Sequence, residues 1–136
     1  MKKNKTNDFE NEVVITLVRR AFNGTCPVYK PTLYANGRCA YEGETFVRVI
    51  GRKTFTISET RIRMLISLID GIGFLSLKES YEEGVIPDMA TAVNSITING
   101  KTKSVRNYYG DPNAPKELTR LEHMIDKTVN SHQWVK

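Results

Sequence analysis

Apolar and polar residues alternate in short runs over most of the chain, and turn-forming residues separate the runs. Runs rich in β-branched and aromatic side chains predict strands at residues 12–20, 28–35, 38–42, 45–50, 53–57, 91–98 and 101–108. Asn36-Gly37 and Asn99-Gly100 each lie between two such runs, and this dipeptide favours a β-hairpin. A two-residue loop at the first turn would pair Leu33 with Ala40 and Tyr34 with Cys39.

Two other segments show helical spacing. Ser58 is a natural N-cap and precedes apolar residues at three- and four-residue intervals, namely Ile62, Leu65, Ile66 and Ile69. Pro115 opens a second segment, whose apolar stripe comprises Leu118, Leu121, Ile125 and Val129. Residues 79–90 are polar and acidic and are interpreted as a loop. The order β-β-β-β-α-β-β-α predicts an α+β fold, an antiparallel sheet of hairpins with two helices on one face.

The second hairpin admits two registers. A plain two-residue turn at Asn99-Gly100 would pair Ile96 with Lys103, whereas a bulge at Gly100 would pair Ile96 with Ser104. The bulge would turn both Lys101 and Lys103 toward solvent while the isoleucines face the core. We therefore predict the bulged register.

Length and charge favour one domain without a membrane span. The chain has 136 residues and a formal net charge of +5, and Lys2, Lys3 and Lys5 lie in a tail, residues 1–10, that we predict to be disordered and basic. Residues 11–136 then form a single, nearly balanced domain. No long apolar stretch follows the tail, so we expect a cytoplasmic protein without membrane insertion, or an exported one if a signal was trimmed.

Four short motifs, read in order, carry a resemblance to a known family. They are Gly24-Thr25-Cys26-Pro27-Val28-Tyr29, Tyr41-Glu42-Gly43, Phe74-Leu75-Ser76-Leu77-Lys78 and Tyr108-Tyr109-Gly110. Over residues 12–135 the chain resembles an uncharacterised family of small domains of unknown function, known mostly from bacterial envelope proteins. The resemblance implies a compact α+β domain, often exported, without an established activity. Family members often have a second Cys shortly before the position of Cys26, where this chain has Phe22 or a neighbour.

Candidate catalytic and metal-binding chemistry is sparse. The soft metal ligands are Cys26, Cys39, His123 and His132, and none has the spacing of a zinc site. Gly100-Lys101-Thr102 imitates the end of a phosphate loop, but Ser95 stands where that motif needs a glycine. The predicted register also places the two cysteines beyond disulfide reach. We therefore predict no enzyme activity, no metal and no cofactor.

Tyrosines on strands and glycine-bearing loops are typical of interaction surfaces. We predict a non-catalytic binding or protein-interaction module for an unknown protein or small ligand, with binding residues Thr25, Tyr29, Arg106, Tyr108 and Tyr109. Only one of the adjacent Tyr108 and Tyr109 can face outward from a strand. The alternative is a single-stranded nucleic-acid-binding domain whose basic, tyrosine-bearing sheet face uses Lys101, Lys103 and Arg106. The sequence leaves the oligomeric state open.

Overall fold

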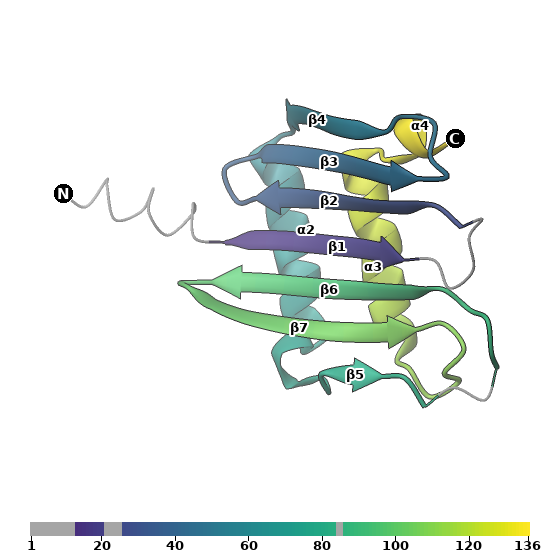
Figure 1. Cartoon of the computed structure of the whole chain (residues 1–136). Helices are drawn as coiled ribbons and strands as arrows, with labels where there is room; N and C mark the ends of the chain where they lie inside the picture. Colours follow the sequence, from purple (N-terminus) through teal and green to yellow (C-terminus); the bar gives the residue numbers. More distant parts are fainter. Residues whose placement is uncertain (1–12, 21–25, 84–85) are drawn as a thin grey trace.

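A seven-stranded sheet with helices against one face forms the protein (Figure 1). The computed structural model describes residues 13–20, 26–83 and 86–136, and the predicted tail lies outside this part of the chain. The strand order is β4-β3-β2-β1-β6-β7-β5, and every neighbouring pair is antiparallel except β5 with β7. The predicted α+β class, with two long helices on one face, is confirmed.

The strands are β1 (Val14–Arg20), β2 (Val28–Tyr34), β3 (Arg38–Thr45), β4 (Gly51–Thr56), β5 (Ser80–Tyr81), β6 (Thr91–Ile98) and β7 (Lys101–Tyr108). The helices are α2 (Glu59–Gly71), the 3-10 helix η1 (Phe74–Ser76), α3 (Lys116–Val129) and the short α4 (His132–Val135). Ser58 caps α2 as predicted, because its Oγ accepts a hydrogen bond from the Arg61 N–H at 3.3 Å. The short strand β5 lies within the segment that the sequence indicated to be a loop.

The two Asn-Gly turns differ from the predicted ones: the first hairpin has the longer loop, and the second has the plain two-residue turn. In the first hairpin Leu33 pairs with Cys39, because residues 35–37 form a three-residue loop with Gly37 at a φ of 95°. In the second hairpin Asn99 and Gly100 have φ angles of 52° and 80°, which are the left-handed values that a plain two-residue turn requires. Both predicted registers are therefore wrong.

The predicted strand at residues 45–50 is also wrong. Those residues form the connection between β3 and β4, and the backbone of Phe46 has a φ of 54°, which is incompatible with a continuous strand. The amides of Arg48 and Val49 donate to the carbonyls of Val135 and Trp134 instead of to a neighbouring strand. The connection is thereby joined to α4.

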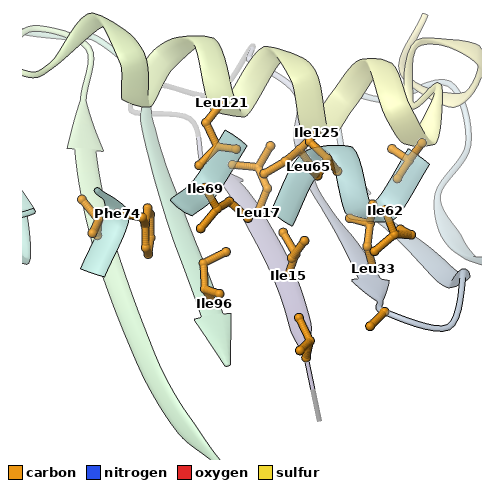
Figure 2. Close-up of a cluster of buried hydrophobic side chains, with 14 of the residues drawn as sticks. Ile15, Leu17, Leu33, Ile62, Leu65, Ile69, Phe74, Ile96, Leu121 and Ile125 are labelled. Atoms are coloured by element: carbon orange, nitrogen blue, oxygen red, sulfur yellow. The ribbon is translucent and has the colours of Figure 1, made fainter. Parts of the chain in front are cut away.

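The core lies between the sheet and the helices (Figure 2). Side chains from the inward face of the sheet meet those from the apolar stripes of α2 and α3. The fully or almost fully buried members include Ile15, Leu17, Leu33, Ile62, Leu65, Phe74, Ile96, Leu118, Leu121 and Ile125. Trp134 of α4 extends this layer, its ring centroid 4.8 Å from that of Tyr41 and 5.2 Å from that of Phe55. No helix in residues 13–20, 26–83 or 86–136 is long and apolar enough to cross a bilayer.

Candidate functional site

The predicted binding residues fall on two opposite faces of the sheet. Tyr29 and Tyr109 point toward the helices, whereas Arg106 and Tyr108 lie on the side that no described helix covers. Thr25 is outside the described residues. The Tyr108 hydroxyl donates to the Ile86 carbonyl at 2.5 Å, so it anchors a neighbouring segment. The five predicted residues therefore do not form one site.

An ion pair near the carboxyl end of β1 organises the helix-covered side. The Arg19 Nε donates to Asp126 Oδ2 at 2.9 Å, and Nη2 lies 2.8 Å from the same oxygen. The hydroxyls of Tyr29 and Ser131 donate to Asp126 Oδ1 at 3.0 Å and 2.5 Å. Arg19 Nη1 also donates to the Tyr109 hydroxyl. Asp126 thus joins two strands to the end of α3.

A second carboxylate, Glu122, lies one helical turn before Asp126 and is 0% exposed. It accepts hydrogen bonds from the Tyr109 hydroxyl at 2.5 Å, from Asn94 Nδ2 at 2.7 Å and from Asn107 Nδ2 at 3.0 Å. Neither Asn94 Oδ1 nor Asn107 Oδ1 has a hydrogen-bond partner among the described residues. We call the set Arg19, Tyr29, Asn94, Asn107, Tyr109, Glu122, Asp126 and Ser131 the buried polar network.

The buried polar network holds its two tyrosines in the protonated form. Burial raises the pKa of Tyr29 to about 12, and the negative charge of Asp126 adds to the rise while Arg19 opposes it. Burial also raises the pKa of Tyr109, with Glu122 reinforcing the effect against Arg19. Burial alone would lower the pKa of Arg19, but the charge of Asp126 outweighs it and raises that pKa. The network is therefore suited to holding strands and helix together.

These shifts predict a loss of stability in alkali. Between pH 10 and pH 12 the unfolded Tyr29 ionises while the folded one stays protonated, so unfolding releases a proton. The free energy of unfolding is expected to fall with rising pH, by about 1.4 kcal/mol per pH unit for one tyrosine at the steepest part. Urea denaturation across this range measures the slope. Tyr29→Phe should flatten the slope, and Tyr34→Phe, a change outside the network, should leave it unaltered; equal slopes in all three proteins would contradict the assignment.

The opposite side of the sheet, which we call the open face, carries a row of small side chains. Paired positions on six adjacent strands bring together Thr54, Ala40, Thr32, Thr16, Ser95 and Ser104. The Ser95 and Ser104 hydroxyls are 2.8 Å apart, as are those of Thr97 and Thr102 one row away. Small hydroxyl side chains leave this part of the surface flat and polar.

Charged side chains lie on both sides of that row. Glu42 pairs with Lys30 at 3.5 Å and with Arg52 at 3.2 Å, and Glu82 pairs with Arg106 at 3.5 Å. The Arg38 guanidinium makes no ion pair within the described part of the chain. No described acidic side chain therefore neutralises Arg38.

A hollow of about 550 Å³ lies on the open face over β3 and β4. Its lining includes Ala40, the smallest member of the row, and the outward side chains of Tyr34, Arg38, Arg52, Thr54 and Thr56. Two guanidinium groups, a phenol ring and two hydroxyls can bind a carboxylate or phosphate beside an apolar or aromatic group. We call this set the Ala40 hollow.

The lysines of the nucleic-acid alternative do not share a face with Arg106. Lys103 pairs with Ile96, so it projects to the helix-covered side, where its Nζ donates to the Leu77 carbonyl at 2.6 Å. Arg106 pairs with Val93 on the open face. The predicted basic surface of Lys101, Lys103 and Arg106 is therefore not formed.

The phosphate-loop-like motif, the cysteines and the possible metal ligands do not form a site among the described residues. Gly100-Lys101-Thr102 lies in a hairpin turn rather than between a strand and a helix, as a phosphate loop requires. Cys26 and Cys39 are free thiols, and burial raises the pKa of Cys39 to about 11. Within residues 13–20, 26–83 and 86–136 no group of three or more His, Cys, Asp or Glu side chains can hold a metal ion.

Sequence reasoning missed Arg19, Glu122 and Asp126, although one of them leaves a signal. Glu122 comes four residues after Leu118 and three before Ile125, so it occupies a position of the apolar stripe. A charged residue at such a position indicates a buried partner. Arg19 lacks a comparable signal, because it comes at the end of a strand where polar residues are common.

Comparison with known proteins supports the family expectation. A family model described as a domain of unknown function, DUF6438, matches residues 13–129. No curated protein matches the chain. The predicted resemblance to a family of unknown function is thereby confirmed. Because the match extends from the first described strand to the last turn of α3, the protein belongs to the DUF6438 family.

Proposed function

We propose that the domain is a non-catalytic binding module and that an acidic segment of a partner protein binds to the open face. The observation that carries the proposal is the Ala40 hollow, whose lining includes Tyr34, Arg52 and Arg38, the last without an ion pair among the described residues. Both long helices lie on the other side of the sheet (Figure 1), so the described helices leave this surface accessible. A partner could bind there without displacing any part of the described fold.

The charge of the open face favours an acidic partner. Its cationic side chains are Arg20, Lys30, Arg38, Arg52 and Arg106, and the acidic side chains paired with them are Glu42 and Glu82. Glu44, on the same strand as Glu42, is exposed as well, so the described residues give five positive charges against three negative ones, an excess of two. Complementary charge steers the approach of a partner and opposes the binding of basic surfaces.

A single-stranded nucleic acid is the second candidate ligand. The observation that favours it is that Tyr34 lines the Ala40 hollow together with two arginines. A base can stack on a tyrosine ring while its phosphate binds arginine. The residues of this candidate therefore differ from the lysines that the sequence suggested.

The test uses two labelled probes, a polyglutamate peptide and an oligothymidylate, with fluorescence anisotropy as the measurement. Arg38→Gln/Arg52→Gln removes both cations of the Ala40 hollow and is expected to weaken binding of the preferred probe about tenfold, which is about 1.4 kcal/mol. The matched control is Lys116→Gln/Arg120→Gln on the exposed side of α3, which changes the net charge equally. The control should bind like the parent protein.

Each outcome decides between the candidates. Tighter binding of the peptide than of the oligonucleotide supports the protein-interaction module, and the reverse order supports the nucleic-acid binder. Binding of neither probe, or equal affinities for the parent and the Arg38→Gln/Arg52→Gln variant, would exclude the Ala40 hollow as the binding site. A steep loss of affinity with salt is expected for the oligonucleotide.

A further inference from the structure

A second pocket lies where α3 ends and α4 begins, on the helix-covered side of the sheet. Its volume is about 580 Å³, within the range of roughly 300–1,000 Å³ that is usual for small-molecule sites. Its floor is formed by Arg19, Tyr29 and Asp126 of the buried polar network, and its walls include His123, Lys127 and His132. We call it the corner pocket.

The acidic side chain in the floor is already neutralised. Asp126 accepts hydrogen bonds from Arg19, from the Tyr29 hydroxyl and from the Ser131 hydroxyl. It is the one carboxylate side chain among the described residues that line the pocket. The arginine itself has five N–H groups, of which Nε, one on Nη1 and one on Nη2 are directed to Asp126 or Tyr109. Arg19 therefore retains hydrogen-bonding capacity beyond its protein partners.

The walls of the corner pocket add donors and positive charge. His123 and Lys127 are four residues apart on α3, so they lie on neighbouring turns of the same helix face. Lys127 is exposed and forms no ion pair with any described residue. Lys127 and Arg19 together exceed the charge of Asp126, so the pocket has a net positive charge.

The carboxyl end of α3 would normally disfavour an anion, because its last carbonyls carry partial negative charge. Here two of those carbonyls accept hydrogen bonds from the backbone that follows the helix. The Asp126 carbonyl accepts from the Ser131 N–H at 3.1 Å, and the Lys127 carbonyl accepts from the Asn130 N–H at 3.2 Å. Asn130 has the left-handed conformation that permits this closure, with φ 54° and ψ 46°. The closure thus removes two acceptors from the helix end.

We propose that the corner pocket binds a small organic anion whose carboxylate or phosphate group lies between Lys127 and Arg19. Both groups donate charge-assisted hydrogen bonds, and Arg19 is held in place by its contacts with Asp126 and Tyr109. This site is independent of the open face, because the Ala40 hollow lies on the opposite side of the sheet. It adds a small-molecule function to the proposed partner-binding function.

The test is a titration of the full ¹⁵N-labelled chain, followed by NMR, with inorganic phosphate in one arm and succinate in another. Sodium chloride at matched ionic strength is the control for non-specific salt effects. Saturable shifts are expected for the Arg19 Nε–H and for the backbone amides of residues 127–132. Lys127→Gln should weaken binding about tenfold, and Lys127→Arg should retain it.

The controls keep the two proposals separate. Lys116→Gln removes an exposed lysine from the first turn of the same helix and should leave the titration unchanged. Arg38→Gln/Arg52→Gln should also leave it unchanged, whatever that variant does at the open face. A response to phosphate alone or to succinate alone identifies the preferred anionic group. The absence of saturation in both arms, shifts that sodium chloride reproduces, or full affinity in Lys127→Gln would overturn the proposal.

Discussion

Asp126→Ala is expected to lower the free energy of unfolding by about 3–5 kcal/mol, the usual consequence of removing one partner of a buried ion pair. The side chains of Arg19 and Asp126 are only 16% and 20% exposed, so the remaining guanidinium would lose its counter-ion without gaining full hydration. The hydroxyls of Tyr29 and Ser131 would lose their acceptor as well. Guanidinium denaturation monitored by circular dichroism measures the change.

Two further variants show whether the loss comes from the ion pair. Arg19→Met combined with Asp126→Ala removes both charges, and the double variant is expected to be more stable than the sum of the single changes predicts. Glu59→Ala breaks an exposed ion pair with Arg63, whose side chain is 69% exposed, and should change stability by less than about 1 kcal/mol. An Asp126→Ala protein as stable as the Glu59→Ala control would contradict a structural role for the network.

The sheet and its covering helices could be predicted because each depends on a local period. Alternation along a strand and three- or four-residue spacing along a helix both follow from backbone geometry. Leu118 and Ile125 thus indicate the buried side of α3, and Ile15 and Leu17 the inward side of β1, without any knowledge of their partners. The α+β class follows from the order of these elements.

The hairpin registers could not be predicted from the Asn-Gly dipeptides, since such a turn fits a loop of two or three residues. The burial of side chains in the core determines which of the two loop lengths forms. Leu33 and Cys39 are both buried, at 0% and 3% exposure, and the three-residue loop is what pairs them. In the second hairpin the assumption that lysine must face away from the core was misleading. Lys103 lies at the edge of the core and its long side chain reaches the Leu77 carbonyl.

The two candidate sites depend on contacts between distant parts of the chain. Arg19 and Asp126 are 107 residues apart, and neither is unusual in its local sequence. The Ala40 hollow is lined by residues of β2, β3 and β4 that become neighbours only through the pairing of these strands, so the sequence alone does not show it. Tyr29 and Tyr109 were predicted as binding residues from their type, but the structure places their hydroxyls against Asp126 and Glu122.

Phe74→Ala is expected to destabilise the protein by about 3–5 kcal/mol, because a large buried ring would be replaced by a cavity. Phe74 is 1% exposed and lies beside Ile69 and Ile96 at one end of the core (Figure 2). Its position depends on Gly73, whose left-handed φ of 68° turns the chain back beneath α2. The side chains around Phe74 belong to other elements and can move only partly into the space, so part of the cavity would remain.

The neighbouring residue gives a matched control for Phe74→Ala. Leu75 belongs to the same 3-10 helix but is 62% exposed, so Leu75→Ala should change the free energy of unfolding by less than about 0.5 kcal/mol. Chemical denaturation of both variants under the same conditions tests the pair. If the two substitutions had equal effects, η1 would not close the core, and the burial that separates Phe74 from Leu75 would be wrong. A large loss of unfolding free energy for Phe74→Ala alone would show that the side chain of Phe74 completes the packing between α2 and the sheet.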